Sequence, residues 1–421
     1  MNNRPSYIRV IQFSVFCWSA MAFTLPFSSA LTQLFAYLAV FSSLILFSKD
    51  GLTRIFREPL VQLTLGLWVL LSLSVFWSIA PLPELTEGWS KYRKLLFAII
   101  FVFAVSRNPD CLWLPLKAFA ASNGIIAFLA CLVWLGVDQW RPPDSGIFFV
   151  GPASNPTIGR NHITQGAFQV MAASLSIGFA LAARSVNVRV GWLSVGVLTL
   201  FTSLGLLQGR TGYLLAIVAA AVLVLLLISV RRFKVAVLVG FAAFLLFSSI
   251  WQLSPNFGPR TIQAIQSIEK YSSGADPNAD QGVRLQFYAA GFNIFLESPV
   301  LGNGVGSFAE AYSRLPNENA DLQRSRAQPH SEYINLMVQG GSLALALFLA
   351  IGGLALKQAW GGVDDKAKSP KDFSLAILVT LFWVGSAVNS YIWDLAEGHL
   401  LIIILGTVAS RSILSKQVAP S

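Results

Sequence analysis

Long apolar stretches alternate with short polar interruptions along almost the whole of this 421-residue chain. A helix of roughly 17 to 25 apolar residues is long enough to cross the ~30 Å hydrocarbon core of a bilayer. The pattern predicts twelve spans, near residues 10–28, 30–48, 60–80, 94–106, 112–137, 162–183, 190–208, 212–230, 233–251, 331–356, 373–391 and 398–411. The weakest is 94–106, whose apolar core is short unless its helix begins nearer Trp89. The sequence therefore predicts an all-α polytopic membrane protein.

One long polar interval, residues 252–330, separates the first nine spans in residues 1–251 from the last three in residues 331–421. Apolar residues recur at helical spacing in two parts of it: Ile262, Ile265 and Ile268, and then Leu285, Tyr288, Phe292 and Phe295, with Pro299 ending the second run. These patterns predict two helices lying along the membrane surface. The following LGNGVGSF lacks the preceding strand and the GK(S/T) of a phosphate loop, so we interpret it as a tight backbone connection.

Composition and charge support this class and suggest an orientation. The chain is 55% hydrophobic and only 12% charged, which excludes an ordinary soluble globular domain. With the N-terminus inside, one face carries eighteen of the thirty basic residues and six acids, whereas the other carries twelve bases and fourteen acids. Basic residues near span ends are retained in the cytoplasm, so both termini are predicted there and the large loop in the periplasm. The excess of +10 is spread over short turns, which argues against a nucleic-acid partner.

The residues that usually bind metals are sparse. Three scattered cysteines lack the spacing of a zinc site or a disulfide framework. No Asp-x-Asp pair lies on the predicted outer face, since Asp276 and Asp280 are four apart and Asp364 with Asp365 falls in a cytoplasmic loop. We therefore expect no metal and no cofactor, with an activity that survives chelation.

Several basic residues lie on the outer face, which membrane insertion disfavours. The turn around Arg210 is too short to carry its guanidinium far from the bilayer, and ionisable groups held there are costly and commonly functional. Guanidinium groups bind two phosphate oxygens at once, so converging arginines would suit a lipid diphosphate. The candidates for diphosphate binding are Arg210, Arg284, Arg160 and Lys91, whereas Arg93 and Lys94 are interpreted as headgroup anchors. The alternative for each candidate is a residue that merely reaches lipid headgroups or caps a helix.

His330, one of only three histidines, lies in PHSEYINLMVQGG where the polar interval re-enters the membrane. Its ordinary pKa near 6.5 makes it a possible proton acceptor at neutral pH, and a nearby helix N-terminus would favour the neutral form. Glu332 could orient the imidazole or act as the base itself. A histidine that simply caps the helix is the alternative, and it is the preferred interpretation for His162 and His399.

The combination GVRLQFYAAGFNIFLESPVLGNGVGSF followed by HSEYINLMVQGG resembles the O-antigen ligase and polymerase superfamily. The resemblance is carried by Arg284, Pro299, Gly302, Gly304, Gly306, His330 and Ser331, and by Arg210 in an earlier short turn. It implies a GT-C-like architecture of about twelve transmembrane helices with one large helical periplasmic loop, in the bacterial inner membrane.

By that resemblance, the chain would act as an O-antigen ligase, a glycosyltransferase of lipopolysaccharide biosynthesis. It would move O-antigen from undecaprenyl diphosphate to lipid A core, by an inverting and metal-independent reaction. His330 would deprotonate the acceptor hydroxyl, while Arg210 and Arg284, helped by Arg160, would hold the diphosphate. Its partners would be the lipid-linked donor, the lipid A core acceptor and membrane lipids.

Three alternatives stay open. An O-antigen polymerase would share the architecture. A transporter or flippase for lipid-linked glycans also has about twelve spans, but it usually places ionisable residues near the midplane of repeated halves. A non-enzymatic assembly scaffold explains the basic residues poorly.

Overall fold

The computed structural model describes residues 5–107, 109–137, 150–275, 280–315, 328–361 and 369–418. Within these ranges the chain forms helices and their connections without any β-strand, apart from one isolated bridge between Val150 and Ile158. The all-α prediction is confirmed.

Each predicted span coincides with a helix. These helices are α1 (Pro5–Thr24), α2 (Ser29–Leu44), α4 (Pro59–Leu73), α5 (Leu82–Val105), α6 (Leu114–Trp134), α7 (His162–Ala182), α8 (Val186–Phe201), α9 (Arg210–Ser229), α10 (Phe233–Leu253), α14 (Glu332–Trp360), α15 (Pro370–Val388) and α16 (Leu395–Val418). Nine helices of the described chain are long and apolar enough to cross a membrane, by length and composition. The other three are α1, α2 and α5. The helix α5 begins at Leu82, well before the predicted start at residue 94, and its first thirteen residues include five charged ones.

Polar residues set several of these helix boundaries. The Ser28 side chain accepts a hydrogen bond from the backbone N–H of Leu31 at the start of α2, and the Asn161 side chain accepts from Ile163 and Thr164 at the start of α7. Such caps satisfy N–H groups that the first turn of a helix leaves without partners. The Asn161 cap therefore fixes where the segment containing Arg160 turns into the bundle.

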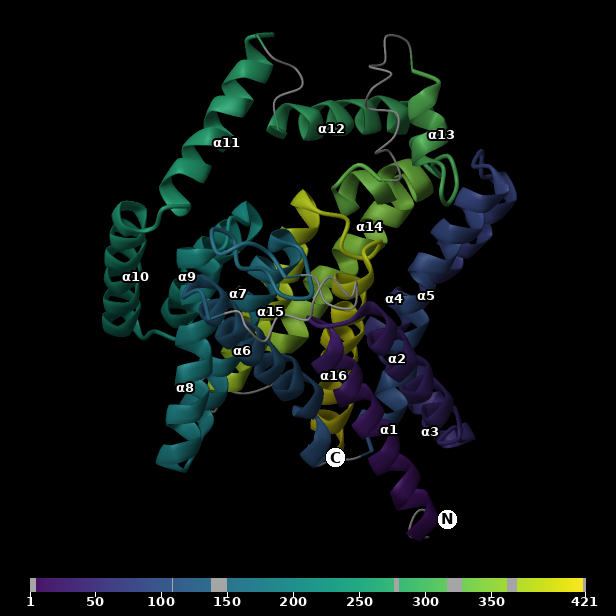
Figure 1. Ribbon diagram of the computed structural model, residues 1–421. Helices are drawn as coiled ribbons and strands as arrows, with labels where there is room; N and C mark the ends of the chain where they lie inside the picture. Colours follow the sequence, from purple (N-terminus) through teal and green to yellow (C-terminus); the bar gives the residue numbers. More distant parts are fainter. Residues whose placement is uncertain are drawn as a thin grey trace.

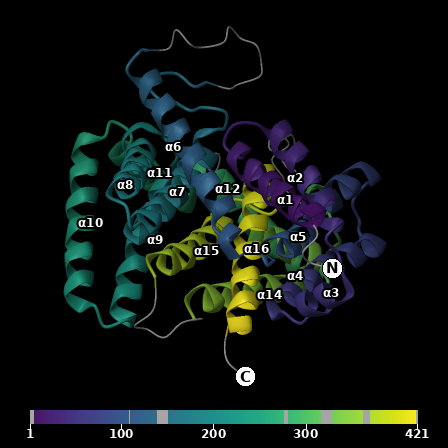
Figure 2. The ribbon, with the colours of Figure 1, turned by 90° about the horizontal axis from the view of Figure 1, so that it is seen from below.

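The bundle surrounds α16, which both views place near its centre (Figures 1 and 2). By contrast, α10 stands at the edge in both views, and Ala236 is its one buried residue. Because α10 is apolar and so little of its surface is covered by protein, it is suited to contact lipid. The short helix α3 (Lys49–Phe56) lies near the chain's N-terminus.

Three helices of the polar interval extend beyond one end of the bundle: α11 (Phe257–Ser272), α12 (Asp280–Glu297) and α13 (Phe308–Ser313). The two predicted helices are confirmed as α11 and α12. In Figure 1, α12 lies crosswise above the bundle, whereas α11 rises steeply instead of lying flat. Its predicted apolar stripe, Ile262, Ile265 and Ile268, is 44–51% exposed, because little of the bundle covers α11.

At the opposite end, two ion pairs with buried carboxylates join α16 to the start of α4 and to α15. Glu58, which precedes α4, is almost completely buried, and it accepts hydrogen bonds from Lys416 at 2.8 Å and Ser412 at 3.1 Å on α16. Arg411 of α16 pairs with Asp372 of α15 at 2.7 Å. Removing one partner of a buried pair costs about 3–5 kcal/mol. These contacts hold α16 at one end, and its other end begins at the site described next.

Candidate functional site

The last two residues of α15 and its connection to α16, residues 387–394, gather contacts from elements that carry the predicted site residues. We name this segment the α15–α16 corner. The hydroxyl of Tyr288 lies 3.4 Å from the carbonyl oxygen of Ala387, and Nη1 of Arg284 donates to the carbonyl oxygen of Val388 at 3.1 Å. The next residue, Asn389, donates from Nδ2 to the hydroxyl of Thr211 at 3.3 Å. Three consecutive residues therefore meet α12 twice and the first turn of α9 once.

His330 is joined to this assembly through Tyr288. The Tyr288 hydroxyl donates to the carbonyl oxygen of His330 at 3.1 Å, and the imidazole lies 6.1 Å from the ring of Phe287 between centroids. His330 has φ 54°, a left-handed conformation that residues other than glycine rarely adopt. Strained backbone of this kind is concentrated at functional sites.

The imidazole of His330 lies close enough to Arg284 to sense its charge. Burial lowers the pKa of His330 below its ordinary value, and the positive charge of Arg284 lowers that pKa further. The ring is therefore neutral at neutral pH, as a proton acceptor must be. Burial also raises the pKa of the Tyr288 hydroxyl, so this group stays protonated and donates its hydrogen bond.

A second set of contacts clamps the other half of the corner. Glu332, fully buried at the start of α14, accepts hydrogen bonds at Oε2 from the backbone N–H groups of Ile392 at 2.9 Å and Trp393 at 3.2 Å. Lys94 of α5 donates from Nζ to the carbonyl oxygens of Trp393 at 3.3 Å and Asp394 at 2.6 Å. Lys94 is 3% exposed, so its interpretation as a headgroup anchor is wrong. A lysine can be buried here because two carbonyl oxygens replace its water.

The position of Glu332 also limits the roles suggested for it. Its carboxylate holds the corner, and among the described residues no hydrogen bond joins it to His330.

Gln328 donates to Oδ1 of Asp394 at 3.3 Å and so ties the segment just before His330 to the same corner. Burial, followed by the nearby Glu397, raises the pKa of Asp394 well above its ordinary value. The carboxyl group of Asp394 is therefore protonated more readily than an ordinary aspartate.

Arg210 lies at the first position of α9, where its Nε donates to the backbone carbonyl oxygen of Arg260 at 3.1 Å. Arg260, in the first turn of α11, in turn donates from Nη2 to Oε1 of Gln208. The two arginines are thus cross-connected, each bonded to the segment that carries the other. Arg260 was not among the candidates from sequence.

The remaining two candidates have other contacts. Arg160 donates from Nε to the carbonyl oxygen of Leu25 at 2.9 Å and from Nη1 to Ser29 at 2.5 Å, so it anchors the turn between α1 and α2. Lys91 pairs with Glu87 at 3.1 Å and lies 6.0 Å from the ring centroid of Trp393. Within the part of the chain that the structure describes, no hydrogen bond or ion pair joins either residue to Arg210, Arg284 or His330.

The glycines of LGNGVGSF allow backbone to pack on backbone. Gly304 has φ +87°, and a Cβ atom there would lie 2.3 Å from Cα of Ser78. Gly306 has φ +78°, and its Cβ would lie 2.5 Å from the carbonyl oxygen of Glu84. Only glycine fits such positions without strain. The interpretation as a tight connection is confirmed, and it fixes the end of α12 against α5.

Metal ligands do not gather in the described chain: no group of three or more His, Cys, Asp or Glu side chains could hold an ion there. Asp276, Asp364 and Asp365, three of the four aspartates considered from the sequence, lie outside the described residues.

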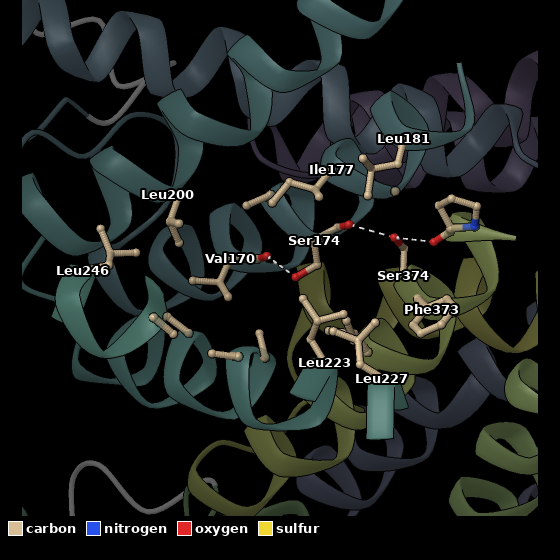
Figure 3. A pocket seen from close by; sticks show the side chains of 18 of the residues that line it. Val170, Ser174, Ile177, Leu181, Leu200, Leu223, Leu227, Leu246, Phe373 and Ser374 are labelled. Atoms are coloured by element: carbon tan, nitrogen blue, oxygen red, sulfur yellow. Dashed lines mark hydrogen bonds between the residues drawn. The ribbon is translucent and has the colours of Figure 1, made fainter. Parts of the chain in front are cut away.

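An apolar cavity of about 400 Å³ lies between α7, α8, α9, α10 and α15 (Figure 3). Of its described lining residues only Arg232 is charged, and Ser174 and Ser374 hydrogen bond to backbone carbonyl oxygens. Ser374 is near the start of α15, whereas the corner follows its end. This cavity has the character of a site for apolar chains, not for catalysis.

Sequence reasoning missed Lys94, Arg260, Asn389 and Asp394 as site residues. A weak signal existed for two of them. A polar Asn389 and an ionisable Asp394 interrupt two apolar helices, and such residues in a membrane protein commonly mark function. Nothing in the local sequence distinguishes Lys94 from its exposed neighbours.

A known protein family matches part of the chain. Residues 195–349 match the family model described as O-antigen ligase, and this segment includes Arg210, Arg260, Arg284 and His330. No curated protein matches the chain. This match supports membership of the O-antigen ligase and polymerase superfamily.

Proposed function

We propose that this protein is an O-antigen ligase that transfers a glycan from undecaprenyl diphosphate to lipid A core. Superfamily membership indicates an enzyme that processes O-antigen, with lipid-linked glycans and lipid acceptors as its general substrates. The observation that carries the finer proposal is the α15–α16 corner. Ala387, Val388 and Asn389 meet the elements that bear His330, Arg284 and Arg210, three residues far apart in sequence.

In the proposed reaction, neutral His330 accepts the proton of an acceptor hydroxyl. The acceptor oxygen then bonds to the anomeric carbon of the donor sugar, while the bond from that carbon to the diphosphate oxygen breaks. Polyprenyl diphosphate leaves with the bonding electron pair, and direct displacement inverts the anomeric centre. Arg284 and Arg210 stabilise the negative charge on the leaving diphosphate, and charge-assisted hydrogen bonds are well suited to this role.

The membrane arrangement is part of the proposal. The distribution of basic residues supports a multi-pass protein of the bacterial inner membrane with both termini in the cytoplasm and the corner facing the periplasm. On this basis, residues 252–330 form a periplasmic loop between spans one to nine and spans ten to twelve. Arg160 and Lys91 would assist at the diphosphate site only if the substrate reaches them, because their own contacts are with other segments.

Location favours a transferase over a transporter or flippase. Arg284 contacts the corner at one end of α15, His330 is linked to it through Tyr288, and Thr211 next to Arg210 bonds to Asn389, whereas a transported headgroup needs polar groups near the bilayer midplane. The cavity nearer the other end of α15 is lined mainly by apolar side chains. Such a lining would not carry a hydrophilic glycan across the bilayer.

The test is reconstitution of the purified protein with an undecaprenyl-diphosphate-linked glycan and two alternative acceptors. Transfer to lipid A core supports a ligase, whereas extension of a free lipid-linked repeat unit supports a polymerase. His330→Ala should abolish transfer while leaving insertion in the membrane unchanged. Wild-type transfer by that variant would refute the assignment of the base.

A further inference from the structure

The apolar cavity between α7, α8, α9, α10 and α15 is about as long as one leaflet of a membrane is thick. Its lining on α9 runs from Ala216 to Leu227, a rise of about 16 Å at ~1.5 Å per residue. The hydrocarbon core of a bilayer is ~30 Å thick, so this length matches the acyl chains of a single leaflet. Figure 3 shows the cavity elongated, with Leu246 at one end and Leu181 at the other.

The cavity opens sideways on the lipid-facing surface. Three of its lining residues, Ile177, Leu181 and Leu246, are 38–60% exposed. The hydroxyl groups of Ser174 and Ser374 donate to backbone carbonyl oxygens, so neither has a donor hydrogen left for a ligand. The lining therefore suits an apolar chain that enters from the membrane.

Arg232 gives this apolar cavity one positive charge. Its side chain is exposed, and among the described residues no carboxylate pairs with it. Asp372, two residues after the lining residue Pro370, is already paired with Arg411 at 2.7 Å. The charge of Arg232 is therefore available to an anion.

A strained turn fixes Arg232 at the end of α9. The backbone N–H of Arg232 donates to the carbonyl oxygen of Leu227 at 2.9 Å, and that of Arg231 donates to Ile228 at 2.9 Å. These two bonds form a Schellman motif, in which glycine usually takes the left-handed position. Here Arg231 takes it, with φ 59°. Residues 231, 232 and 234 are all basic, and such clusters attract anionic headgroups.

This charge lies at the other end of the bundle from the α15–α16 corner. Thr211, at the start of α9, bonds to the corner, whereas Arg232 follows the end of α9. The 20 residues of α9 separate the two places by about 30 Å. A lipid whose charged head is held at the corner cannot also place that head at Arg232. The occupant with its head at Arg232 therefore belongs to the opposite leaflet.

We propose that the cavity binds an anionic phospholipid of the leaflet opposite the corner, with its phosphate at Arg232 and one acyl chain between α7, α9, α10 and α15. Because α10 packs mainly on α9, this chain fills the space between α10 and α7 and holds α10 to the bundle. The phospholipid is a structural component, and its binding does not depend on the reaction proposed at the corner.

The experiment uses the full purified chain in detergent, with dioleoylphosphatidylglycerol as the probe. Dioleoylphosphatidylethanolamine, which has the same chains but no net charge, is the comparison. Native mass spectrometry measures the lipid that the protein retains and, in a titration, its Kd. The wild type should bind phosphatidylglycerol more tightly than phosphatidylethanolamine, and its thermal unfolding midpoint should rise as phosphatidylglycerol binds.

The first pair of variants tests the headgroup. In Arg232→Gln the Kd of phosphatidylglycerol should rise about fivefold, because one basic residue near a membrane surface contributes about 1 kcal/mol. The Kd of phosphatidylethanolamine should not change. The matched control is Arg54→Gln, because Arg54 is an exposed arginine of α3 outside the lining.

A second pair of variants tests the acyl chain. Ala220 and Ala221 are neighbours on α9, but only Ala220 lines the cavity, whereas Ala221 is exposed. Ala220→Trp fills the cavity and should abolish the binding of both phospholipids. Ala221→Trp should bind them as the wild type does. Each pair is decisive by itself, so the test stands if one variant does not fold.

Three results would overturn the proposal. Equal Kd values of the two phospholipids for the wild type would remove the role of Arg232. Normal binding of phosphatidylglycerol by Ala220→Trp would remove the cavity as the site of the chain. Undecaprenyl phosphate that displaces phosphatidylglycerol at equal concentration would assign the cavity to a polyprenyl chain instead.

Discussion

The contact between Tyr288 and His330 offers the sharpest test of how the structure positions the base. Tyr288→Phe removes a hydroxyl that lies 3.1 Å from the carbonyl oxygen of His330 and 3.4 Å from that of Ala387. One such hydrogen bond stabilises a protein by about 0.5–1.5 kcal/mol net. Because His330 is held at φ 54°, losing this bond allows its backbone to relax toward more favourable angles.

We expect kcat to fall roughly fivefold in Tyr288→Phe, which corresponds to about 1 kcal/mol of lost orientation. Donor and acceptor KM should stay within about twofold, because Tyr288 positions the base and does not itself hold substrate. The measurement is steady-state glycan transfer by purified protein over a range of both substrates.

The matched control is Tyr333→Phe. The Tyr333 hydroxyl also donates to a carbonyl oxygen at 3.1 Å, that of Trp383. Tyr333 lies in the first turn of α14, which begins two residues after His330. Both variants should lower the thermal unfolding midpoint by a similar amount, and only Tyr288→Phe should lower kcat. A normal kcat in Tyr288→Phe, or an equal loss in both variants, would contradict the positioning role.

Three further predictions concern charge. Because the pKa of His330 lies below its ordinary 6.5, kcat/KM of the wild type should hold at neutral pH and fall only as pH drops through that lower pKa. Arg284→Gln removes a positive charge, so the pKa of His330 should rise and the fall in kcat/KM should begin at higher pH. A pH profile of the variant's residual activity checks this shift. Lys94→Met leaves the buried carbonyl oxygens of Trp393 and Asp394 without a donor, so it should destabilise the protein by about 3 kcal/mol and lower its unfolding midpoint, whereas Lys91→Met should have a much smaller effect. Transfer should continue in EDTA at the untreated rate, and activity that is lost in EDTA and restored by magnesium would refute a metal-free site.

The spans were predictable because about twenty consecutive apolar residues leave a helix few other choices in a membrane. The start of α5 was not, since five charged residues among its first thirteen resemble a loop. Tertiary contacts explain them: Lys94 is buried against the corner, and Gly88 packs on Gly306 so closely that a Cβ atom would lie 2.9 Å from its Cα. Neither contact can be recognised from the local pattern of apolar and polar residues.

The candidate site was partly predictable for a similar reason. His330 and Arg284 are exceptional residues for their positions, so the sequence identifies them, although it cannot show that they meet. Asn389 was hidden because the predicted span ran to residue 391, whereas α15 ends at Val388, where the next residue takes an extended conformation with φ −152°. Arg260 was hidden because it lies among other polar residues of the large loop, and only tertiary contacts, its bond to Gln208 and the bond from Arg210 to its carbonyl oxygen, relate it to Arg210.

The acceptors that hold Arg284 and Arg260 explain how the site can remain ready for an anion. Arg284 donates to the carbonyl oxygen of Val388, and Arg260 donates to two amide oxygens. A neutral oxygen fixes the direction of a guanidinium but does not cancel its charge, whereas a carboxylate would do both. The described residues provide no carboxylate partner for either arginine, so an arriving diphosphate need not displace an existing ion pair. The acids near the corner have other roles than pairing with these arginines: Glu332 accepts hydrogen bonds from backbone N–H groups, and the raised pKa of Asp394 makes its carboxyl group readily protonated.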